Sequence, residues 1–387
     1  MGPVTSTGLI RDLTDDEARR ALVHKWGSQD PDVLPAWVAE MDYALAPPVA
    51  DALQRAVADG VVGYPPFDDS GPLGEALAAF SDRHFGWSID PEQVIATVDV
   101  TAGIRVVLET LSEPGPMVLP TPAYSPQFGI AGLAGRETWE LPLAPDAESA
   151  MLDLDRLDDL FARGARTLLL TQPQNPLGYV HTRADLEAIR DVVVRHGARV
   201  ISDEIHGPLV LPGTTQVPYL ALDGTTDHAV AVTAASKAFN TPGLRCAQIV
   251  TADPAVRDRL LAEPVCRNDS WSPLGEVAAI AAYTDGDAWL AALVERLGQQ
   301  RDLLGSLLAE HLPLVRMRPL QATYLAWLDL RDYGHDDPAA LALDKGRLHV
   351  EAGHRYQPDL PGHVRVNIAT SPERLTEIVR RLALACA

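Results

Sequence analysis

Residues 167–178 read TLLLTQPQNPLG, an apolar run followed by a polar turn that contains Asn175. Two later stretches have the same order: residues 200–206 read VISDEIH, and residues 229–237 read AVAVTAASK. Asp203 and Lys237 therefore follow apolar runs just as Asn175 does. None of these runs alternates apolar and polar residues, which is typical of strands covered on both faces of a sheet.

Similar apolar runs stand at 94–98 and 117–119, and helical patterns lie between the runs. The helical stretch 182–196 opens with the capping pattern Thr182-x-x-Asp185 and stops at Gly197. This alternation predicts an α/β fold with a mostly parallel sheet flanked by helices. A helix also opens at about Ile104, after the run at 94–98.

The pattern changes near residue 287, where a long helical segment runs through 312, followed by a mixed stretch at 323–330 and a last helix from Pro372. We read this part as a second, smaller α+β domain. The expected division is an N-terminal segment at 1–48 that contributes to the small domain, a large ligand-binding domain at 49–286, and the C-terminal small domain at 287–387.

Length and composition agree with a globular chain of this size. The 387 residues leave room for two domains, and 47% are hydrophobic and 22% charged. The formal net charge is −21, so a polyanion would be repelled by the average surface and we expect no nucleic-acid partner.

Three cysteines are too few for a disulfide framework in a chain of this length, and no two have the spacing of metal ligands. We therefore expect a reducing compartment and no metal. The first sixteen residues lack the pattern of a signal peptide, and no run of eighteen apolar residues occurs. The expectation is a cytoplasmic protein without a membrane partner.

Ligands of open parallel sheets bind beyond the carboxyl ends of the strands, where Asn175, Asp203 and Lys237 are expected. Singly, these residues are common in turns, helix caps and solvated loops. Together they match the chemistry of pyridoxal 5′-phosphate (PLP). A lysine forms a Schiff base with its aldehyde, a carboxylate keeps the pyridine nitrogen protonated, and an amide fixes the 3′ oxygen.

Two further elements suit the phosphate of PLP. Arg245 lies eight residues beyond Lys237, where its guanidinium could bind the phosphate with two hydrogen bonds. The turn Thr101-Ala102-Gly103 follows the strand at 94–98 and precedes a helix, so its backbone N–H groups could bind the same phosphate.

The segments at 175–178, 202–206, 236–240 and 243–245 resemble the fold-type I PLP-dependent enzymes of the aspartate aminotransferase superfamily. Finer motifs resemble the MalY/PatB-type cystathionine β-lyases, also called C–S lyases. These motifs are WVAEMD at 37–42, GYPP at 63–66, TPAY at 121–124, the His of DEIH at 203–206, ATYLAWLD at 322–329 and RVN at 365–367. The resemblance extends from about Lys25 to the last helix.

The resemblance implies a role for each matching residue. Lys237 would bind the PLP aldehyde, Asp203 the ring nitrogen, and Asn175 the 3′ oxygen. Tyr124 would stack on the cofactor ring and take part in catalysis, and Arg365 would bind the substrate α-carboxylate, with Tyr124 and Asn175 also touching the substrate.

Three more residues complete the predicted cofactor site. His206 and Ser236 flank the matching motifs, and His206 stands where aminotransferases usually have a tyrosine. Tyr64 would reach the phosphate from the neighbouring subunit, which implies a homodimer with shared active sites. The segment 268–273 departs from the better-known members, and Cys246 stands where aminotransferases often have glycine, so both leave the substrate preference open.

The activity implied is α,β-elimination from L-cystathionine or a related cysteine thioether, which yields a thiol (homocysteine from cystathionine), pyruvate and ammonia. A class I/II aminotransferase is the alternative, because such enzymes use the same Lys, Asp and Asn. A regulatory protein that binds a transcription factor is the third. Pyruvate release measured against amino transfer to a 2-oxo acid separates the first two.

Overall fold

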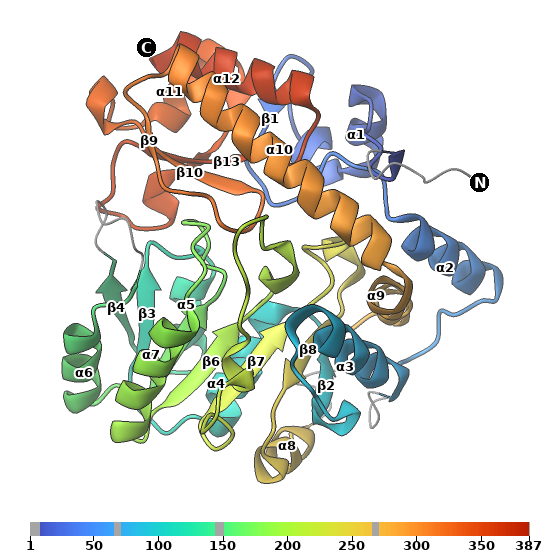
Figure 1. The fold of residues 1–387 in the computed structure, drawn as a ribbon, viewed down its shortest axis with the longest axis vertical. Helices are drawn as coiled ribbons and strands as arrows, with labels where there is room; N and C mark the ends of the chain where they lie inside the picture. Colours follow the sequence, from blue (N-terminus) through green and yellow to red (C-terminus); the bar gives the residue numbers. More distant parts are fainter. Residues whose placement is uncertain (1–7, 66–70, 144–150, 265–270, 387) are drawn as a thin grey trace.

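The larger part of the chain is built around one sheet, coloured from cyan to yellow in the lower half of Figure 1. The computed structural model describes residues 8–65, 71–143, 151–264 and 271–386, and within them seven strands form this sheet in the spatial order β2-β8-β7-β6-β5-β3-β4. β8 is antiparallel to both neighbours, and the other neighbouring pairs are parallel. The predicted mostly parallel sheet is therefore confirmed. The strands are β2 (Val94–Thr97), β3 (Met117–Thr121), β4 (Thr138–Pro142), β5 (Thr167–Thr171), β6 (Arg199–Asp203), β7 (Ala229–Thr233) and β8 (Ala247–Val250).

Helices connect or flank these strands, and most of them cover the sheet. They are α2 (Pro47–Ala58), α3 (Gly71–Phe85), α4 (Val100–Leu111), α5 (Gln127–Leu133), α6 (Leu154–Ala162), α7 (Arg183–Arg195), α8 (Pro254–Leu261) and α9 (Pro273–Asp285), with the short turns η3 (Pro91–Gln93), η4 (Gly207–Leu209), η5 (Tyr219–Ala221) and η6 (Pro242–Leu244). Of these helices, α2 packs against α9. α7 begins as predicted, because the Thr182 side chain accepts the Asp185 N–H at 3.1 Å and the Asp185 carboxylate accepts the Thr182 N–H at 2.8 Å.

Both faces of the sheet are buried, which explains the continuous apolar runs. In β5, Leu168 and Leu170 belong to the buried cluster that includes Leu186 of α7. Leu169 points the other way and belongs to a second buried cluster with Ile104 of α4. A strand covered on both sides has no exposed face, so its sequence has no polar alternation.

The smaller domain, in the upper half of Figure 1, contains an antiparallel sheet in the order β12-β13-β10-β9 and a parallel pair β1-β11. Its C-terminal elements are α10 (Asp287–His311), β9 (Arg316–Met317), β10 (Leu325–Asp329), η8 (Arg331–Tyr333), α11 (Pro338–Gly346), β11 (Leu348–His349), β12 (Glu351–Ala352), η9 (Gly353–Arg355), β13 (His363–Asn367) and α12 (Pro372–Cys386). Its N-terminal elements are α1 (Asp15–Ala21), the π-helical turn η2 (Val23–Gly27) and β1 (Leu34–Pro35).

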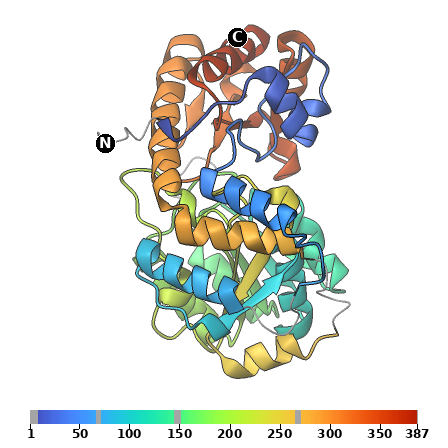
Figure 2. The same cartoon turned by 90° about the vertical axis from the view of Figure 1, so that its right-hand side faces the viewer.

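The N-terminal segment lies against the C-terminal part of the chain, as the blue and red ribbons at the top of Figure 2 show. Leu34 pairs with Leu348 in the β1-β11 ladder, and the Tyr43 hydroxyl donates to the Thr370 carbonyl at 2.9 Å. We propose that the small domain consists of residues 1–48 and 287–387, with the large domain at 49–286.

The chain passes from α9 to α10 at Gly286, where the two helices are bent by 82°. A Cβ at this position would lie 2.3 Å from the Ala282 carbonyl oxygen and 2.4 Å from the Phe239 ring, so the close approach requires glycine. In the part of the chain that the structure describes, no single helix is long and apolar enough to cross a membrane, and α9 and α10 pass that test only as this bent pair.

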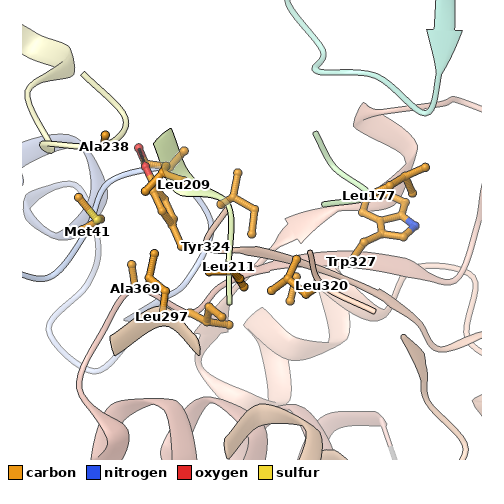
Figure 3. Packing of buried hydrophobic residues seen from close by; sticks show 14 of the residues in the cluster. Met41, Leu177, Leu209, Leu211, Ala238, Leu297, Leu320, Tyr324, Trp327 and Ala369 are labelled. Carbon is orange, nitrogen blue, oxygen red and sulfur yellow. Dashed lines mark hydrogen bonds between the residues drawn. The ribbon is translucent and has the colours of Figure 1, made fainter. Parts of the chain in front are cut away.

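One continuous hydrophobic core joins the two domains. Figure 3 shows Leu209 and Leu211 of the large domain near Tyr324 and Leu320 of the small domain, with Met41 of the N-terminal segment nearby. All five belong to the same buried cluster. Apolar packing therefore holds these two parts of the chain together at this contact.

Candidate active site

A cavity of about 340 Å³ lies beyond the carboxyl ends of β5, β6 and β7, between the large sheet and the small domain. This volume suits a small cofactor and substrate. The lining includes nine of the residues predicted from sequence: Thr101, Tyr124, Asn175, Asp203, His206, Ser236, Lys237, Arg245 and Arg365. Other lining residues include Trp37, Asp99, Glu351, Arg355 and Tyr356.

Lys237 follows β7 and is the lysine of this cavity. The chain has three lysines, of which Lys25 is held in a buried ion pair and Lys345 is exposed on α11. Lys237 Nζ donates to the Ala39 carbonyl at 3.1 Å. Burial, together with the positive charge of Arg365, lowers the pKa of Lys237 to about 8. The neutral amine, which can act as a nucleophile or base, is therefore far more populated near physiological pH than in an ordinary lysine.

Asp203, the last residue of β6, is buried beside this lysine. Its Oδ2 accepts a hydrogen bond from Gln127 Nε2 at 3.0 Å, and its Oδ1 accepts the Ile205 N–H at 3.3 Å. Burial raises the pKa of Asp203 to about 6, although these hydrogen bonds oppose the shift. A carboxyl group in this state favours a cationic partner such as a protonated pyridine nitrogen.

Gln127 is a site residue that our sequence reasoning missed. It begins α5, and its Nε2 donates both to Asp203 and to Thr171 Oγ1, each at 3.0 Å. It stands three residues after Tyr124, beyond the motif at 121–124, and no local pattern marks it as a partner of Asp203. Gln127 holds the orientation of the Asp203 carboxylate.

Arg365 crosses from the small domain toward the ends of the large sheet. Its Nη1 donates to Asn175 Oδ1 at 3.2 Å and its Nη2 to the Trp37 carbonyl at 2.8 Å. The guanidinium lies 5.0 Å from the centre of the Tyr356 ring. Its Nε is buried and has no hydrogen-bond partner among the described residues. A buried guanidinium with donors to spare is suited to a carboxylate ligand.

His206 is buried near the same positive charges. Burial, and then the charges of Lys237 and Arg365, lower its pKa to about 3. The imidazole is therefore neutral at physiological pH, and its Nδ1 has no hydrogen-bond partner within the described part of the chain. A neutral imidazole can form a hydrogen bond with a ligand but cannot form an ion pair with it.

Arg245 and the start of α4 also line the cavity. Here the sequence expectation was wrong in detail, because α4 begins at Val100 and not near Ile104. Asp99 caps the helix by accepting the Ala102 N–H at 2.8 Å, and its carboxylate also pairs with the Arg245 guanidinium. An acidic residue therefore organises both the helix start and the arginine at the predicted phosphate end.

Ala102 and Gly103 are not among the cavity-lining residues. The Gly103 N–H bonds to the Asp99 carbonyl at 2.9 Å within the helix. A Cβ on Gly103 would lie 2.9 Å from Val232 Cγ1, so glycine at this position permits α4 to approach β7. Of the predicted turn, the structure brings Thr101 to the cavity and leaves the two following residues in the first turn of the helix.

The N-terminal segment 36–42, which we call the wall, forms one side of the cavity through Trp37, Val38 and Ala39. The Ala39 carbonyl accepts hydrogen bonds from Lys237 and from the buried Tyr324 hydroxyl, the latter at 3.0 Å. Asn367 Nδ2 donates at 2.7 Å to the carbonyls of both Val38 and Glu40. Backbone oxygens of the wall are therefore held by side chains from both domains.

Contacts from Asn240, Lys25 and Trp26 fix the end of the wall. The Asn240 side chain forms a pair of hydrogen bonds with the Met41 backbone, at 2.9 and 2.8 Å. Lys25 Nζ lies 2.8 Å from the Asp42 carboxylate, and both side chains are almost completely buried. Trp26 Nε1 donates to the same carboxylate at 2.7 Å.

The remaining predicted residues lie at the rim or outside the cavity. Tyr124, between β3 and α5, lines the cavity and is 38% exposed. Tyr64 is 90% exposed and is not a lining residue. Of the segment 268–273, residues 268–270 lie outside the described residues, whereas Trp271 is buried. Cys246 lines the cavity, and burial raises the pKa of its thiol to about 12.

Comparison with known proteins identifies the class. The model of the aminotransferase class I and II family matches residues 37–382. A Mycobacterium tuberculosis protein provisionally named a cystathionine beta-lyase is 38% identical over 403 residues, covering 97% of each chain. The cystathionine beta-lyase of Corynebacterium glutamicum is 34% identical, covering 96% of this chain and 98% of its own.

Among solved structures, a protein of Corynebacterium diphtheriae provisionally described as a PLP-dependent beta-cystathionase superposes with a TM-score of 0.91. It is 32% identical and covers 97% of this chain and 99% of its own. The fold is that of the fold-type I PLP-dependent enzymes. The chain belongs to the aminotransferase class I and II family, and within it is a PLP-dependent lyase related to the MalY and PatB proteins.

The cavity fits PLP on its own chemistry. It offers one lysine whose pKa is lowered, a buried carboxyl group in need of a cation, and an arginine paired with the residue that caps helix α4. It also contains buried polar atoms on His206 and Arg365 that have no partner among the described residues. A polar, anionic ligand with an aldehyde and a ring nitrogen would satisfy these groups.

Proposed function

We propose that the protein is a carbon–sulfur β-lyase that cleaves L-cystathionine or a related cysteine thioether by α,β-elimination. The observation that carries the proposal is the half-buried Lys237 amine, in one cavity with the buried side chains of Asp203 and Arg365. The relatives named cystathionine beta-lyase, similar over almost the whole chain, support elimination as the outcome. The overall reaction converts a thioether and water to a thiol, pyruvate and ammonia.

Lys237 would hold PLP covalently, Asp203 would keep the proton on its ring nitrogen, and Asn175 would donate its amide N–H to the 3′ oxygen. Arg245 and Thr101 would hold the phosphate end. When bound, PLP supplies a ring that accepts the electrons left at the substrate Cα. We place the remaining roles of the reaction on side chains of the cavity.

Arg365 would bind the α-carboxylate of the substrate and so orient the Cα–H bond. Lys237, released as a free amine when the substrate amine takes its place, would remove the Cα proton on Nζ. The Cβ–S bond then breaks with its electron pair on sulfur. A thiol has a pKa of about 8.5, so the thiolate leaves with little help from an acid.

Measurement of products tests this proposal. With L-cystathionine and no added 2-oxo acid, we expect pyruvate, ammonia and homocysteine in equal amounts. Amino transfer to a 2-oxo acid that is faster than pyruvate release for every thioether tested would replace the lyase with an aminotransferase. That second function is favoured by one observation, the match to the aminotransferase family model, since both reactions use Lys237, Asp203 and Asn175.

We also propose that the enzyme is a cytoplasmic homodimer with shared active sites, in which Tyr64 binds the phosphate of the partner's cofactor. Its 90% exposure and its position outside this chain's cavity support that role. Mixing Tyr64→Ala and Lys237→Ala subunits should restore part of the activity, because one site of each heterodimer is intact. Absence of recovery after confirmed subunit exchange would mean that each chain completes its own site.

A further inference from the structure

A charged pair lines the cavity on the small-domain side and is not used by the chemistry described above. Glu351 begins β12, and Arg355 ends the turn η9 that follows it. Glu351 Oε1 lies 3.0 Å from Arg355 Nη1, and both residues line the cavity. The pair therefore borders the space in which the substrate would bind.

The β-sheet register brings this pair next to the proposed α-carboxylate site. Glu351 is directly opposite Arg365 in the antiparallel β12-β13 ladder, so the two side chains lie on the same face of the sheet. Tyr356 adjoins both arginines: the Arg365 guanidinium is 5.0 Å from the centre of its ring, and Arg355 precedes it in sequence. A ligand held by Arg365 would thus have a carboxylate and a second guanidinium within reach.

The Glu351 side chain is largely buried, whereas the Arg355 side chain is exposed. The Glu351 side chain is 10% exposed and that of Arg355 is 56% exposed. A largely buried carboxylate requires a cationic partner, whereas the outer guanidinium can rotate at little cost. The pair can therefore open, provided that an incoming ligand brings one charge of each sign to replace the broken contact.

We propose that Glu351 and Arg355 form the specificity site for the far end of the substrate, where Glu351 binds an ammonium group and Arg355 binds a carboxylate. The preferred substrates are then thioethers whose leaving thiol is itself an amino acid. A neutral S-alkyl group cannot replace either partner of the ion pair. The inference rests on the proposed lyase function and assigns its substrate preference to two residues.

A panel of four substrates tests it: L-cystathionine, S-ethyl-L-cysteine, S-(2-carboxyethyl)-L-cysteine and S-(2-aminoethyl)-L-cysteine. The readout is kcat/KM for pyruvate formation, expressed relative to that of S-ethyl-L-cysteine. Because a hydrogen bond to a charged group contributes about 1.5–3 kcal/mol, Arg355→Gln should lower the relative value roughly 10- to 100-fold for the carboxyethyl substrate and for cystathionine. Glu351→Gln should do so for the aminoethyl substrate and for cystathionine.

The matched control is Arg316→Gln, which removes an arginine from an exposed ion pair with Asp332 in the same domain, away from the cavity. The control should leave all four ratios unchanged. Equal losses on all four substrates in the Glu351 and Arg355 variants would show that the pair only supports η9. Unchanged ratios would show that the distal group does not touch the pair. Either result overturns the inference.

A binding measurement separates this inference from the proposed function. In 2,7-diaminooctanedioate a methylene group replaces sulfur, so no thiolate can leave, and 2-aminooctanoate is a comparable ligand without distal charges. Calorimetry with the holoenzyme should show tighter binding of the first ligand, and Arg355→Gln should remove that advantage. If the wild type releases no pyruvate from any thioether but keeps this preference, only the lyase proposal fails. Pyruvate release without the preference would overturn only the specificity site.

Discussion

The two sides of the cavity are built on different principles. The floor, Asn175, Asp203 and Lys237 at the ends of β5, β6 and β7, provides side chains, and burial shifts the pKa of Asp203 upward and that of Lys237 downward. The wall, residues 36–42, provides mainly backbone carbonyls that are held by side chains from distant parts of the chain. Chemistry is concentrated in the floor, and positioning in the wall.

The difference predicts separate consequences of mutation. A floor residue can be replaced without breaking a large network, so turnover should fall while the fold remains stable. Several contacts of the wall tie residues 36–42 to positions about 200 to 330 residues away in sequence, as in the Asn240–Met41 and Asn367–Val38 pairs, whereas the buried Lys25–Asp42 pair is local. Loss of a wall contact should therefore first reduce stability and only then activity.

The largest effect is expected for Lys237→Ala in the floor. The variant should lose nearly all turnover, because it lacks both the covalent attachment to PLP and the base for the Cα proton. Borohydride reduction followed by peptide mapping should find covalent PLP on Lys237 in the wild type and none in the variant. Mapping is simple because the chain has only two other lysines. Lys345→Ala, at an exposed position, is the control, and wild-type turnover in Lys237→Ala would remove this residue from the mechanism.

Lys25→Met tests the wall. The substitution leaves the Asp42 carboxylate buried beside Trp26 without its cation, which should cost about 3–5 kcal/mol of unfolding free energy. Chemical denaturation of the holoenzyme measures this loss. Arg11→Met removes an exposed ion pair with Glu17 and should cost at most about 1 kcal/mol. Equal costs for the two variants would mean that the buried pair does not anchor the wall.

The floor could be read from sequence because strand order and chemistry agree there. Each strand is short and apolar on both faces, and the residues that follow Leu170, Ile201 and Val232 must meet at one edge of a parallel sheet. The fold class followed from the same pattern. Two strands of the seven-stranded sheet were not predicted: β4 has intermediate and exposed positions at the sheet edge, and β8 carries Gln248 in its centre.

The wall could not be derived in the same way. Hydrogen bonds such as those from Asn367 to the Val38 and Glu40 carbonyls depend on tertiary distance and leave no local pattern in the sequence. For residues 37–42 the only signal was resemblance to known relatives. The sequence prediction put the start of α4 at about Ile104, whereas the helix begins at Val100. The local signal for the true start is Asp99, whose side chain caps the helix.

Asp203→Asn should reduce turnover by about 10²- to 10³-fold, or about 3–4 kcal/mol, because an amide does not stabilise the proton on the ring nitrogen. PLP should remain bound through Lys237 and Arg245. The comparison between floor and wall predicts almost no loss of thermal stability in this variant. A large drop in stability with little change in turnover would reverse the roles assigned to the two regions.

Glu204→Gln provides the matched control, because Glu204 is adjacent to Asp203 and does not line the cavity. Its Oε1 accepts hydrogen bonds from Ser202 Oγ, Gln172 Nε2 and the Tyr219 N–H, at 2.8, 3.2 and 2.8 Å. A glutamine oxygen can accept the same three. We therefore expect turnover close to that of the wild type.

The smallest expected effect is on the pH dependence of the free energy of unfolding, which Glu204→Gln should change. Burial raises the pKa of Glu204 from its usual 4.5 to about 7, so between these values the folded state binds a proton that the unfolded state has lost. The wild type should lose stability as pH rises through this range, by at most about 3 kcal/mol. The variant lacks this titration, so its stability relative to the wild type should increase from pH 4.5 to pH 7 and then stay level. Chemical denaturation at several pH values measures the difference, and a difference that is independent of pH would mean that Glu204 is already ionised in the folded protein at pH 5.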